Sequence, residues 1–229
     1  MEHNRAYSGV DNLEIMQEAA NYNRYLLDLV HRHAPERART LDFGAGNGQF
    51  AGPIAALGYA VTALEPDRGL RDVLTAKGIR TVAGCEELDD ESLDYVYTLN
   101  VLEHISDDVG ALRQVRAKLV SGGRLLAYVP AFPVLYTSMD RKVEHVRRYT
   151  RKTLSAALVA AGFRIERAAY VDCLGFFATL VFKAVGNQDG SVNRSALKLY
   201  DRAVFPLSRL LDSVTQRWFG KNLLVLARK

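Results

Sequence analysis

Cysteine, long hydrophobic runs and excess charge are all scarce in this sequence. The chain has 229 residues and only 2 cysteines, Cys85 and Cys173, whose separation matches no short metal-binding spacing. We therefore expect reduced thiols in a cytoplasmic protein, with no disulfide scaffold and no metal site. The longest apolar stretch, residues 174–185, contains Lys183 and is shorter than the roughly 20 residues that span a bilayer. Residues 1–14 are polar, so we expect no secretory signal.

The charge balance is modest as well. The 30 Lys and Arg residues exceed the 26 Asp and Glu residues by a net charge of +4. This excess is too small to indicate nucleic acid, no recognition motif accompanies it, and we expect no nucleic-acid partner. A composition of 48% hydrophobic and 24% charged residues is typical of a soluble globular protein and excludes a largely disordered chain. The length suits a single domain.

From residue 39 onward, short apolar runs alternate with helical segments. The runs are residues 40–43, 60–64, 79–82, 93–99 and 124–129. Such alternation predicts a parallel sheet with helices on both faces, an α/β fold. An amphipathic helix precedes the first run and ends near residue 33, and Ser106 is the predicted N-cap of the helix after the fourth run.

The alternation stops after residue 171. Residues 172–221 read as helical, with a kink predicted at Pro206, and residues 222–227 read as a last strand. We therefore predict one domain in four parts, which are an N-terminal cap helix in residues 1–35, a cofactor-binding core in 36–171, a helical insertion in 172–221 and the last strand in 222–229.

A glycine-rich loop follows the first predicted strand. Residues 41–50 read LDFGAGNGQF, and glycines between a strand and a helix let a ligand approach the main-chain N–H groups. Glu65 ends the second strand, about twenty residues after Gly44, where a carboxylate accepts hydrogen bonds from both hydroxyls of a ribose. Together these features predict a ligand that contains adenosine; the alternative is a glycine turn that only joins a strand to a helix.

The spacing of the glycines narrows the ligand. A dinucleotide fingerprint reads G-x-G-x-x-G/A, but here the spacing is G-x-G-x-G and Gln49 occupies the sixth position. This pattern disfavours a pyrophosphate seated on the helix. It favours an adenosine ligand without one, such as S-adenosylmethionine.

Four motifs occur in order along the chain. Residues 41–50, 64–66, 100–105 and 122–125 together resemble the class I S-adenosylmethionine-dependent methyltransferases, in particular the small-substrate enzymes of the type 11/12-like kind. Residues 129–150 also resemble a bacterial subgroup associated with cell-surface saccharide or lipid pathways. The resemblance covers about residues 20–171 and the final strand. It implies a doubly wound, Rossmann-like sheet of seven strands, mostly parallel with an antiparallel last strand.

The resemblance also implies a set of contacts to S-adenosylmethionine. Cys85 stands where the family often has an acidic residue near the adenine amine, so Glu86 is the alternative for that contact. Tyr22 is expected to cover the cofactor, or else to be an aromatic on the apolar face of its helix. The implied cofactor-binding residues are Tyr22, Asp42, Gly44, Ala45, Gly46, Gly48, Glu65, Pro66, Cys85, Glu86, Asn100, Val101 and Leu102.

Two histidines are candidates for the chemistry at the methyl group. A methyl on a sulfonium is already electrophilic, so the protein mainly aligns the acceptor, although a hydroxyl acceptor also benefits from a general base. His145, in the basic segment after the fifth core strand, is the preferred base or substrate-orienting group, and His104 is the second candidate. For both, the alternative is a histidine satisfied by a backbone carbonyl.

A basic segment lies beside the expected acceptor site. Arg147 and Arg148 are candidates for binding a phosphate or carboxylate of the acceptor, and Tyr136 and Tyr149 for aromatic walls. The alternative is a solvated loop and helix start.

The sequence therefore predicts methyl transfer from S-adenosylmethionine to an oxygen or nitrogen of a small acceptor, anionic or lipid-linked. A non-catalytic adenosine-cofactor-binding protein and, with less support, a nicotinamide-dependent oxidoreductase are the alternatives. Residues 172–221 combine apolar faces with a basic surplus. They predict packing on the sheet, a homodimer, or peripheral contact with the inner face of a membrane.

Overall fold

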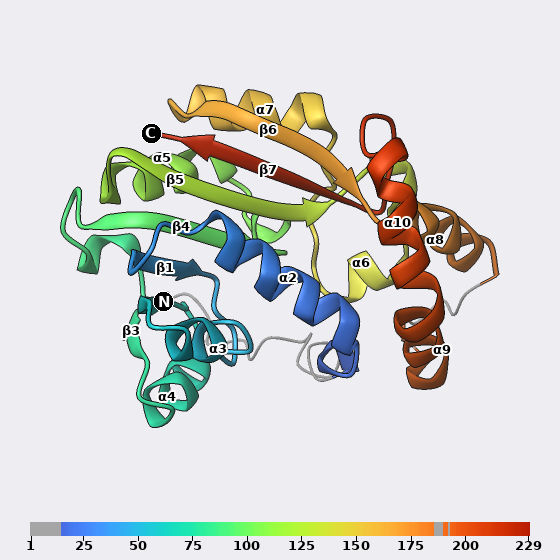
Figure 1. The fold of residues 1–229 in the computed structure, drawn as a ribbon, viewed down its shortest axis with the longest axis horizontal. Helices are drawn as coiled ribbons and strands as arrows, with labels where there is room; N and C mark the ends of the chain where they lie inside the picture. Colours follow the sequence, from blue (N-terminus) through green and yellow to red (C-terminus); the bar gives the residue numbers. More distant parts are fainter. Residues whose placement is uncertain (1–14, 186–189, 192) are drawn as a thin grey trace.

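Seven strands form one sheet at the centre of the molecule (Figure 1). The computed structural model describes residues 15–185, 190–191 and 193–229. The order of the strands is β3-β2-β1-β4-β5-β7-β6. Their bounds are β1 Arg39–Phe43, β2 Ala60–Leu64, β3 Arg80–Val82, β4 Leu93–Leu99, β5 Leu119–Pro130, β6 Arg164–Val171 and β7 Asn222–Arg228.

The directions of the strands confirm the predicted doubly wound sheet. Neighbouring strands from β3 across to β5 pair in parallel, whereas β7 lies antiparallel between β5 and β6. Because the carboxyl ends of parallel strands meet at one edge of a sheet, the loops after β1, β2, β3, β4 and β5 gather there. All the predicted cofactor residues except Tyr22 are on β1 or on these loops.

The side chains of the central strands alternate between two cores. Val96 and Leu125 pack in the core that α5 (Asp108–Lys118) and α7 (Arg151–Ala160) cover, whereas Tyr95, Tyr97 and Tyr128 pack under α2 (Ala20–His33). Successive side chains of a strand point to opposite faces, so a strand that is covered on both faces carries buried side chains on each. The remaining helices of the first two-thirds are α3 (Ala51–Ala56), α4 (Arg68–Ala76) and α6 (Ser138–Lys142), with short turns η1 (Cys85–Glu87), η2 (Leu102–His104) and η3 (Pro133–Leu135).

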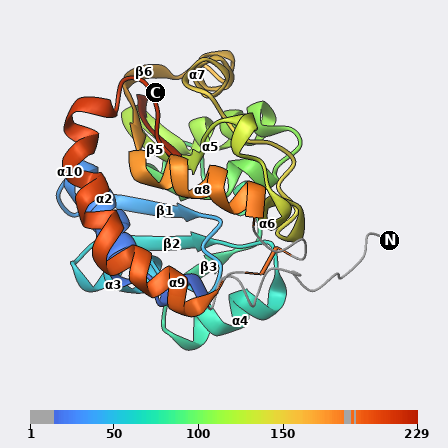
Figure 2. The ribbon, with the colours of Figure 1, turned by 90° about the vertical axis from the view of Figure 1, so that its right-hand side faces the viewer.

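Along the chain the predicted helical insertion follows β6 and precedes β7, and in space it lies beside α2 (Figure 2). It consists of α8 (Cys173–Val185), α9 (Arg194–Leu199), the π-helical turn η4 (Tyr200–Val204) and α10 (Phe205–Thr215). Pro206, where the sequence predicts a kink, is the second residue of α10, and the π-helical turn η4 ends just before that helix begins. Because proline lacks an N–H group and its ring crowds the turn before it, a widened turn at this place is expected. Among the described residues, no helix has the length and apolar character needed to cross a bilayer.

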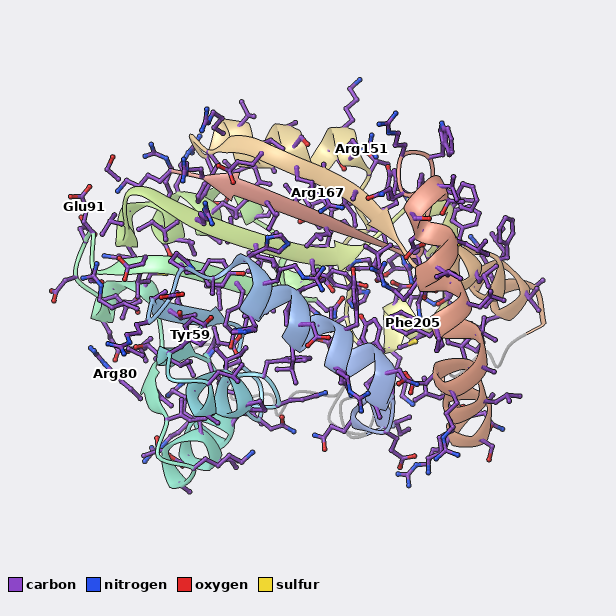
Figure 3. The ribbon with its side chains drawn as sticks, in the orientation of Figure 1. Tyr59, Arg80, Glu91, Arg151, Arg167 and Phe205 are labelled. Carbon is purple, nitrogen blue, oxygen red and sulfur yellow. The ribbon has the colours of Figure 1, made fainter. Side chains whose placement is uncertain are left out.

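A long-range contact fixes the insertion to the first helix. The carboxylate of Asp201, in η4, accepts hydrogen bonds of 2.9 Å from the main-chain N–H groups of Asn21 and Tyr22. Helix α2 has no side-chain cap of its own, so a residue of the insertion satisfies its first N–H groups and interacts favourably with its dipole. Phe205, labelled in Figure 3, begins α10, and its ring packs against Tyr22 and Tyr25. The insertion therefore helps to position the helix that carries Tyr22.

One predicted helix boundary is wrong by a residue. The N-cap of α5 is Asp107 and not Ser106, because the Asp107 carboxylate accepts a hydrogen bond of 2.8 Å from the N–H group of Gly110. Both residues are good N-caps, and the sequence alone did not distinguish them.

Candidate cofactor and acceptor site

The glycine loop connects β1 to α3 with its backbone in a left-handed conformation. The φ angles of Gly44, Gly46 and Gly48 are +85°, +55° and +83°, values that side chains disfavour. A Cβ atom on Gly44 would lie 2.6 Å from a methyl of Val101, whereas a Cβ on Gly46 would meet nothing within 4 Å. Gly44 therefore allows the loop after β4 to approach, and Gly46 leaves open space beside its main chain. Ala45, between them, is buried and its N–H group bonds to Leu64.

Glu65 joins the glycine loop to the end of β2. Its two carboxylate oxygens accept hydrogen bonds of 2.9 Å from the main-chain N–H groups of Gly46 and Asp67. Each carboxylate oxygen has a second lone pair, so Glu65 remains able to accept from further donors. Pro66 is exposed next to it, and Asp67 caps α4 through the N–H group of Leu70. The predicted ribose acceptor is therefore held rigidly beside the loop.

Asp42 lies under the glycine loop with an unsatisfied oxygen. Its side chain is buried, and Oδ2 has no hydrogen-bond partner in the described chain. Burial raises the pKa of Asp42 to about 7; the Glu65 carboxylate acts in the same direction, and the Tyr97 hydroxyl opposes it. A buried acceptor without a partner is costly unless a ligand supplies the donor. The ammonium group of a bound amino acid would be a suitable donor.

The loop after β4 forms the floor of the same region. Asn100 adopts a left-handed φ of 56°, and its N–H group bonds to Tyr128 on β5. Val101 contacts Gly44, as described above, and Leu102 is buried. The structure thus brings the first and third predicted motifs together.

Tyr22 reaches this floor from α2. Its ring makes an edge contact with Tyr128 at 6.3 Å between ring centroids. Burial raises the pKa of the Tyr22 hydroxyl above its usual range, and the nearby polar groups of Asn100 and Tyr128 oppose this shift. The side chain therefore lies at the floor and also on the packed face of α2.

The turn after β3 carries the last two predicted cofactor residues. Cys85 is buried, and burial raises the pKa of its thiol to about 11, so the group stays a neutral thiol. Glu86 is exposed. Of the two, Glu86 is the residue whose carboxylate reaches solvent.

A second group of side chains is centred on Asp140. Its carboxylate accepts hydrogen bonds from Arg148 at 2.7 and 3.0 Å and from the Thr137 N–H group at 2.8 Å, and its Oδ1 lies 2.7 Å from Nδ1 of His145. Although burial opposes it, these contacts hold the pKa of Asp140 well below its usual range. The carboxylate therefore fixes the orientation of the His145 ring and leaves Nε2 pointing away from it.

Glu103 and His104 face His145 from the turn η2. Nε2 of His145 lies 3.8 Å from Oε1 of Glu103, and the two imidazole rings meet edge to face with 4.6 Å between centroids. Burial raises the pKa of Glu103 to about 8, and the positive charge of Arg148 opposes this shift. Burial lowers the pKa of His104 to about 4, and His145 acts in the same direction. The two predicted histidines are thus together, and Glu103 is a third member that the sequence prediction did not include.

The other predicted acceptor residues have partners within the chain. The Tyr136 hydroxyl donates to the main-chain oxygen of His145, and the Tyr149 hydroxyl donates to Asp108, which also pairs with Arg147 at 2.8 Å. Arg148 makes a bidentate pair with Asp140 of the same chain. Their roles in binding an acidic group or forming the walls of an acceptor pocket stay predictions.

We refer below to two parts of the site. The cofactor half is residues 42–48, 65–67, 85–86 and 100–102, and the acceptor half is residues 103–104 and 131–149. They meet at the loop after β4, where Leu102 and Glu103 are adjacent. The open space beside Gly46, the unpartnered oxygen of Asp42 and the position of Glu65 all fit S-adenosylmethionine.

Comparison with known proteins agrees with this geometry. A family model described as a methyltransferase domain matches residues 16–168. The chain belongs to this family, and its domain is of the class I S-adenosylmethionine-dependent type, with S-adenosylmethionine as cofactor. The nicotinamide alternative is thereby set aside.

The match to individual curated proteins covers less of the chain than the match to the family model. The chain is 34% identical over 128 residues to a ubiquinone biosynthesis O-methyltransferase of Methylocella silvestris, a match that covers 45% of this chain and 49% of that protein. It is 34% identical over 93 residues to the protein of the same name from Paramagnetospirillum magneticum, with 36% of each covered. The matches thus span half or less of these curated relatives.

Solved structures share the fold. A S-adenosylmethionine-dependent methyltransferase from Thermotoga maritima superimposes with a TM-score of 0.65 at 18% identity, covering 97% of both chains. A Burkholderia thailandensis 1,6-didemethyltoxoflavin-N1-methyltransferase, solved with its acceptor and S-adenosylhomocysteine, gives a TM-score of 0.60 at 20% identity and covers 96% of this chain and 82% of that one.

Proposed function

We propose that this protein transfers the methyl group of S-adenosylmethionine to a hydroxyl oxygen of a small acceptor. The observation that carries the proposal is the cluster of Glu103, His104 and His145 directly after the floor of the cofactor half. The name of the curated relatives, O-methyltransferase, supports oxygen over nitrogen as the acceptor atom. Methylation of a nitrogen is the second candidate.

The cofactor half would bind S-adenosylmethionine along its length. Asp42 would accept from the amino group of the methionine end, beside the main chain of the glycine loop. Glu65 would accept from the ribose hydroxyls with the lone pairs that Gly46 and Asp67 leave available. The sulfonium supplies an electrophilic methyl group, so these residues act by fixing its position relative to the acceptor half.

The acceptor half would position and deprotonate the acceptor. The acceptor oxygen attacks the methyl carbon in line with the S–C bond, whose electron pair remains on sulfur and gives S-adenosylhomocysteine. The hydroxyl proton leaves at the cluster of Glu103, His104 and His145. His145 is suited to this role because Asp140 fixes its ring, as a third group orients the base in many active sites.

Transfer of a heavy-isotope label tests this proposal. The protein is mixed with S-adenosylmethionine carrying a CD₃ group and with a metabolite extract from a strain that lacks the gene, and mass spectrometry identifies metabolites that gain the label. We expect a labelled methyl ether that is absent with His145→Gln. Binding of S-adenosylhomocysteine without any labelled product would favour the non-catalytic alternative, and a labelled amine would favour nitrogen.

We further propose that the insertion rests on an anionic membrane surface and gives access to a lipid-linked acceptor. An apolar stripe runs along α10 and the turn after it, formed by Leu207, Leu210, Leu211, Val214 and Trp218. Leu210, Val214 and Trp218 are 73%, 64% and 66% exposed, so this stripe faces away from the core, whereas Phe205, Ser208 and Asp212 of α10 are buried. Arg202 and Arg217 are exposed on the same segment, and their positive charge favours anionic lipid over a second copy of the chain.

Co-sedimentation with vesicles tests the membrane contact. We expect binding to vesicles that contain phosphatidylglycerol, weaker binding to phosphatidylcholine alone, and loss of binding with Leu210→Glu. Val159→Glu is the matched control, because Val159 is 59% exposed on α7. A concentration-dependent dimer that Leu210→Glu disrupts, without vesicle binding, would identify the stripe as a homodimer interface instead.

A further inference from the structure

Glu103, His104 and His145 form a compact group of metal-ligating side chains. One ligand atom from each lies within 4.8 Å of the others. Four-coordinate Zn²⁺ holds its ligands at about 2.0–2.1 Å, which places tetrahedral donors about 3.4 Å apart. The separation of 3.8 Å between His145 Nε2 and Glu103 Oε1 is close to that value, so small side-chain movements would complete the geometry.

The side-chain oxygens of Glu103 lack a hydrogen-bond partner among the described residues. The side chain is 0% exposed. A buried carboxylate without hydrogen bonds is costly and calls for an ion or a ligand. The nearby Arg148 does not fill this role, because its guanidinium is bidentate to Asp140.

The surroundings of His145 have the form seen around metal-bound imidazoles. A histidine that binds a metal through one nitrogen usually donates the other N–H to a carboxylate, which fixes the tautomer and the ring orientation. Here Nδ1 lies 2.7 Å from Asp140 Oδ1, and Arg148 and Thr137 hold that carboxylate in turn. Nε2 is the nitrogen turned toward Glu103.

We propose that Glu103, His104 and His145 bind a divalent transition-metal ion of the Zn²⁺ type. Two imidazoles and one carboxylate suit Zn²⁺ better than Mg²⁺, which prefers oxygen ligands, and three protein ligands leave one position open. No short sequence spacing indicates this site, because Glu103 and His104 come from one segment and His145 from another.

The role of the ion rests on the methyl transfer proposed above, with one change: His145 is then a ligand of the ion and no longer the base that takes up the hydroxyl proton. The open position would take the hydroxyl of the acceptor, and binding to the metal lowers the pKa of a coordinated oxygen. The proton then passes to water, the oxygen forms its bond to the methyl carbon, and the S–C electron pair stays on sulfur. The products are the methyl ether, S-adenosylhomocysteine and one proton.

Calorimetric titration with ZnCl₂ alone tests the site without the cofactor or an acceptor. We expect one Zn²⁺ per wild-type chain and at least tenfold weaker binding in Glu103→Gln and in His145→Gln. His33→Gln, in α2, is the matched control and keeps wild-type binding. With Co²⁺ in place of Zn²⁺, the wild type should show the visible ligand-field bands of a four-coordinate nitrogen and oxygen site, a result that does not depend on the folding of any variant.

The possible outcomes distinguish failure of the metal-site proposal from failure of the proposed methyl transfer. Absence of Zn²⁺ binding, binding unchanged in both site variants, or loss only in Cys85→Ser would overturn the metal site. Titration of the same samples with S-adenosylhomocysteine is the second arm. If Zn²⁺ binds as expected and S-adenosylhomocysteine does not, the metal site stands and the proposed methyl transfer fails.

Discussion

The cofactor half and the acceptor half of the site are built in different ways. The cofactor half uses main-chain groups of one glycine loop together with Glu65 and Asp42, all within two consecutive strand–helix units. The acceptor half uses side chains of two segments that are separated by α5 and β5. Asp140 holds His145 within the second segment, and His145 faces Glu103 and His104 of the first. The conformation of a loop depends on residues that are neighbours in the sequence. Contacts between side chains of separate segments form only when the fold brings those segments together.

The largest expected effect is a loss of catalytic rate without a loss of cofactor binding, which distinguishes the acceptor half from the cofactor half. His145→Gln should lower kcat by about 10²–10⁴-fold, the usual size of a general acid–base contribution. The Kd for S-adenosylhomocysteine should stay within about twofold of wild type, because His145 belongs to the acceptor half. Initial rates with the acceptor that the isotope-labelling experiment identifies, together with calorimetry, measure both values. A large rise in Kd with unchanged kcat would show that the two halves are not separate.

The stability of the acceptor half should depend on its buried ion pair. The side chains of Arg148 and Asp140 are 6% and 1% exposed, so Arg148→Met leaves a buried charge unpaired and should lower the free energy of unfolding by about 3–5 kcal/mol. Arg147→Met is the control, because Arg147 is 33% exposed in its pair with Asp108 and such pairs contribute about 0–1 kcal/mol. Urea unfolding of the two variants measures the difference; equal losses would contradict it.

The cofactor half should respond to loss of its carboxylate. Glu65→Ala removes a hydrogen-bonded acceptor and should weaken binding of S-adenosylhomocysteine by about 1–3 kcal/mol, or about 5–150-fold. Its partners Gly46 and Asp67 lose an acceptor too, so Glu65→Gln serves as a milder variant that keeps one. Calorimetry gives the Kd values, and an unchanged Kd in both variants would argue against the ribose contact.

The smallest predicted effect is a pH dependence of cofactor binding. The pKa of Asp42 is raised to about 7, so the carboxylate is mostly protonated at pH 6 and mostly ionised at pH 8. Because only the ionised form attracts the ammonium group of the methionine end, affinity should rise by about tenfold over this range. Asp42→Asn should remove the dependence. Equal slopes for both proteins would assign the titration to another group.

The sequence was sufficient to predict the sheet and the loops of the cofactor half. Ala60–Leu64 and Leu93–Leu99 have the predicted bounds, because buried strands are short apolar runs between turn residues. The glycine spacing and the position of Glu65 also predicted the cofactor, because both lie close together along the chain.

The features that the sequence did not predict depend mainly on contacts that form only in the folded chain. Asp201 caps α2 across 180 residues of sequence, and neither residue alone indicates the other. Arg148 has the charge and geometry to bind an acidic acceptor, and only the fold shows that Asp140 occupies it. Glu103 is apparent as a candidate ligand only when the segment that carries His145 lies against η2. The partners of Asp201 and Glu103 are far away along the chain, whereas Asp140 is only eight residues from Arg148 and the charge pattern did not indicate that they pair.

A crystal structure with S-adenosylhomocysteine tests most directly whether the two halves meet at the sulfur atom. The account predicts the amino acid end beside Asp42 and the glycine loop, the ribose on Glu65, and the sulfur facing the cluster of Glu103, His104 and His145. A ligand bound elsewhere, or a sulfur turned away from that cluster, would contradict it.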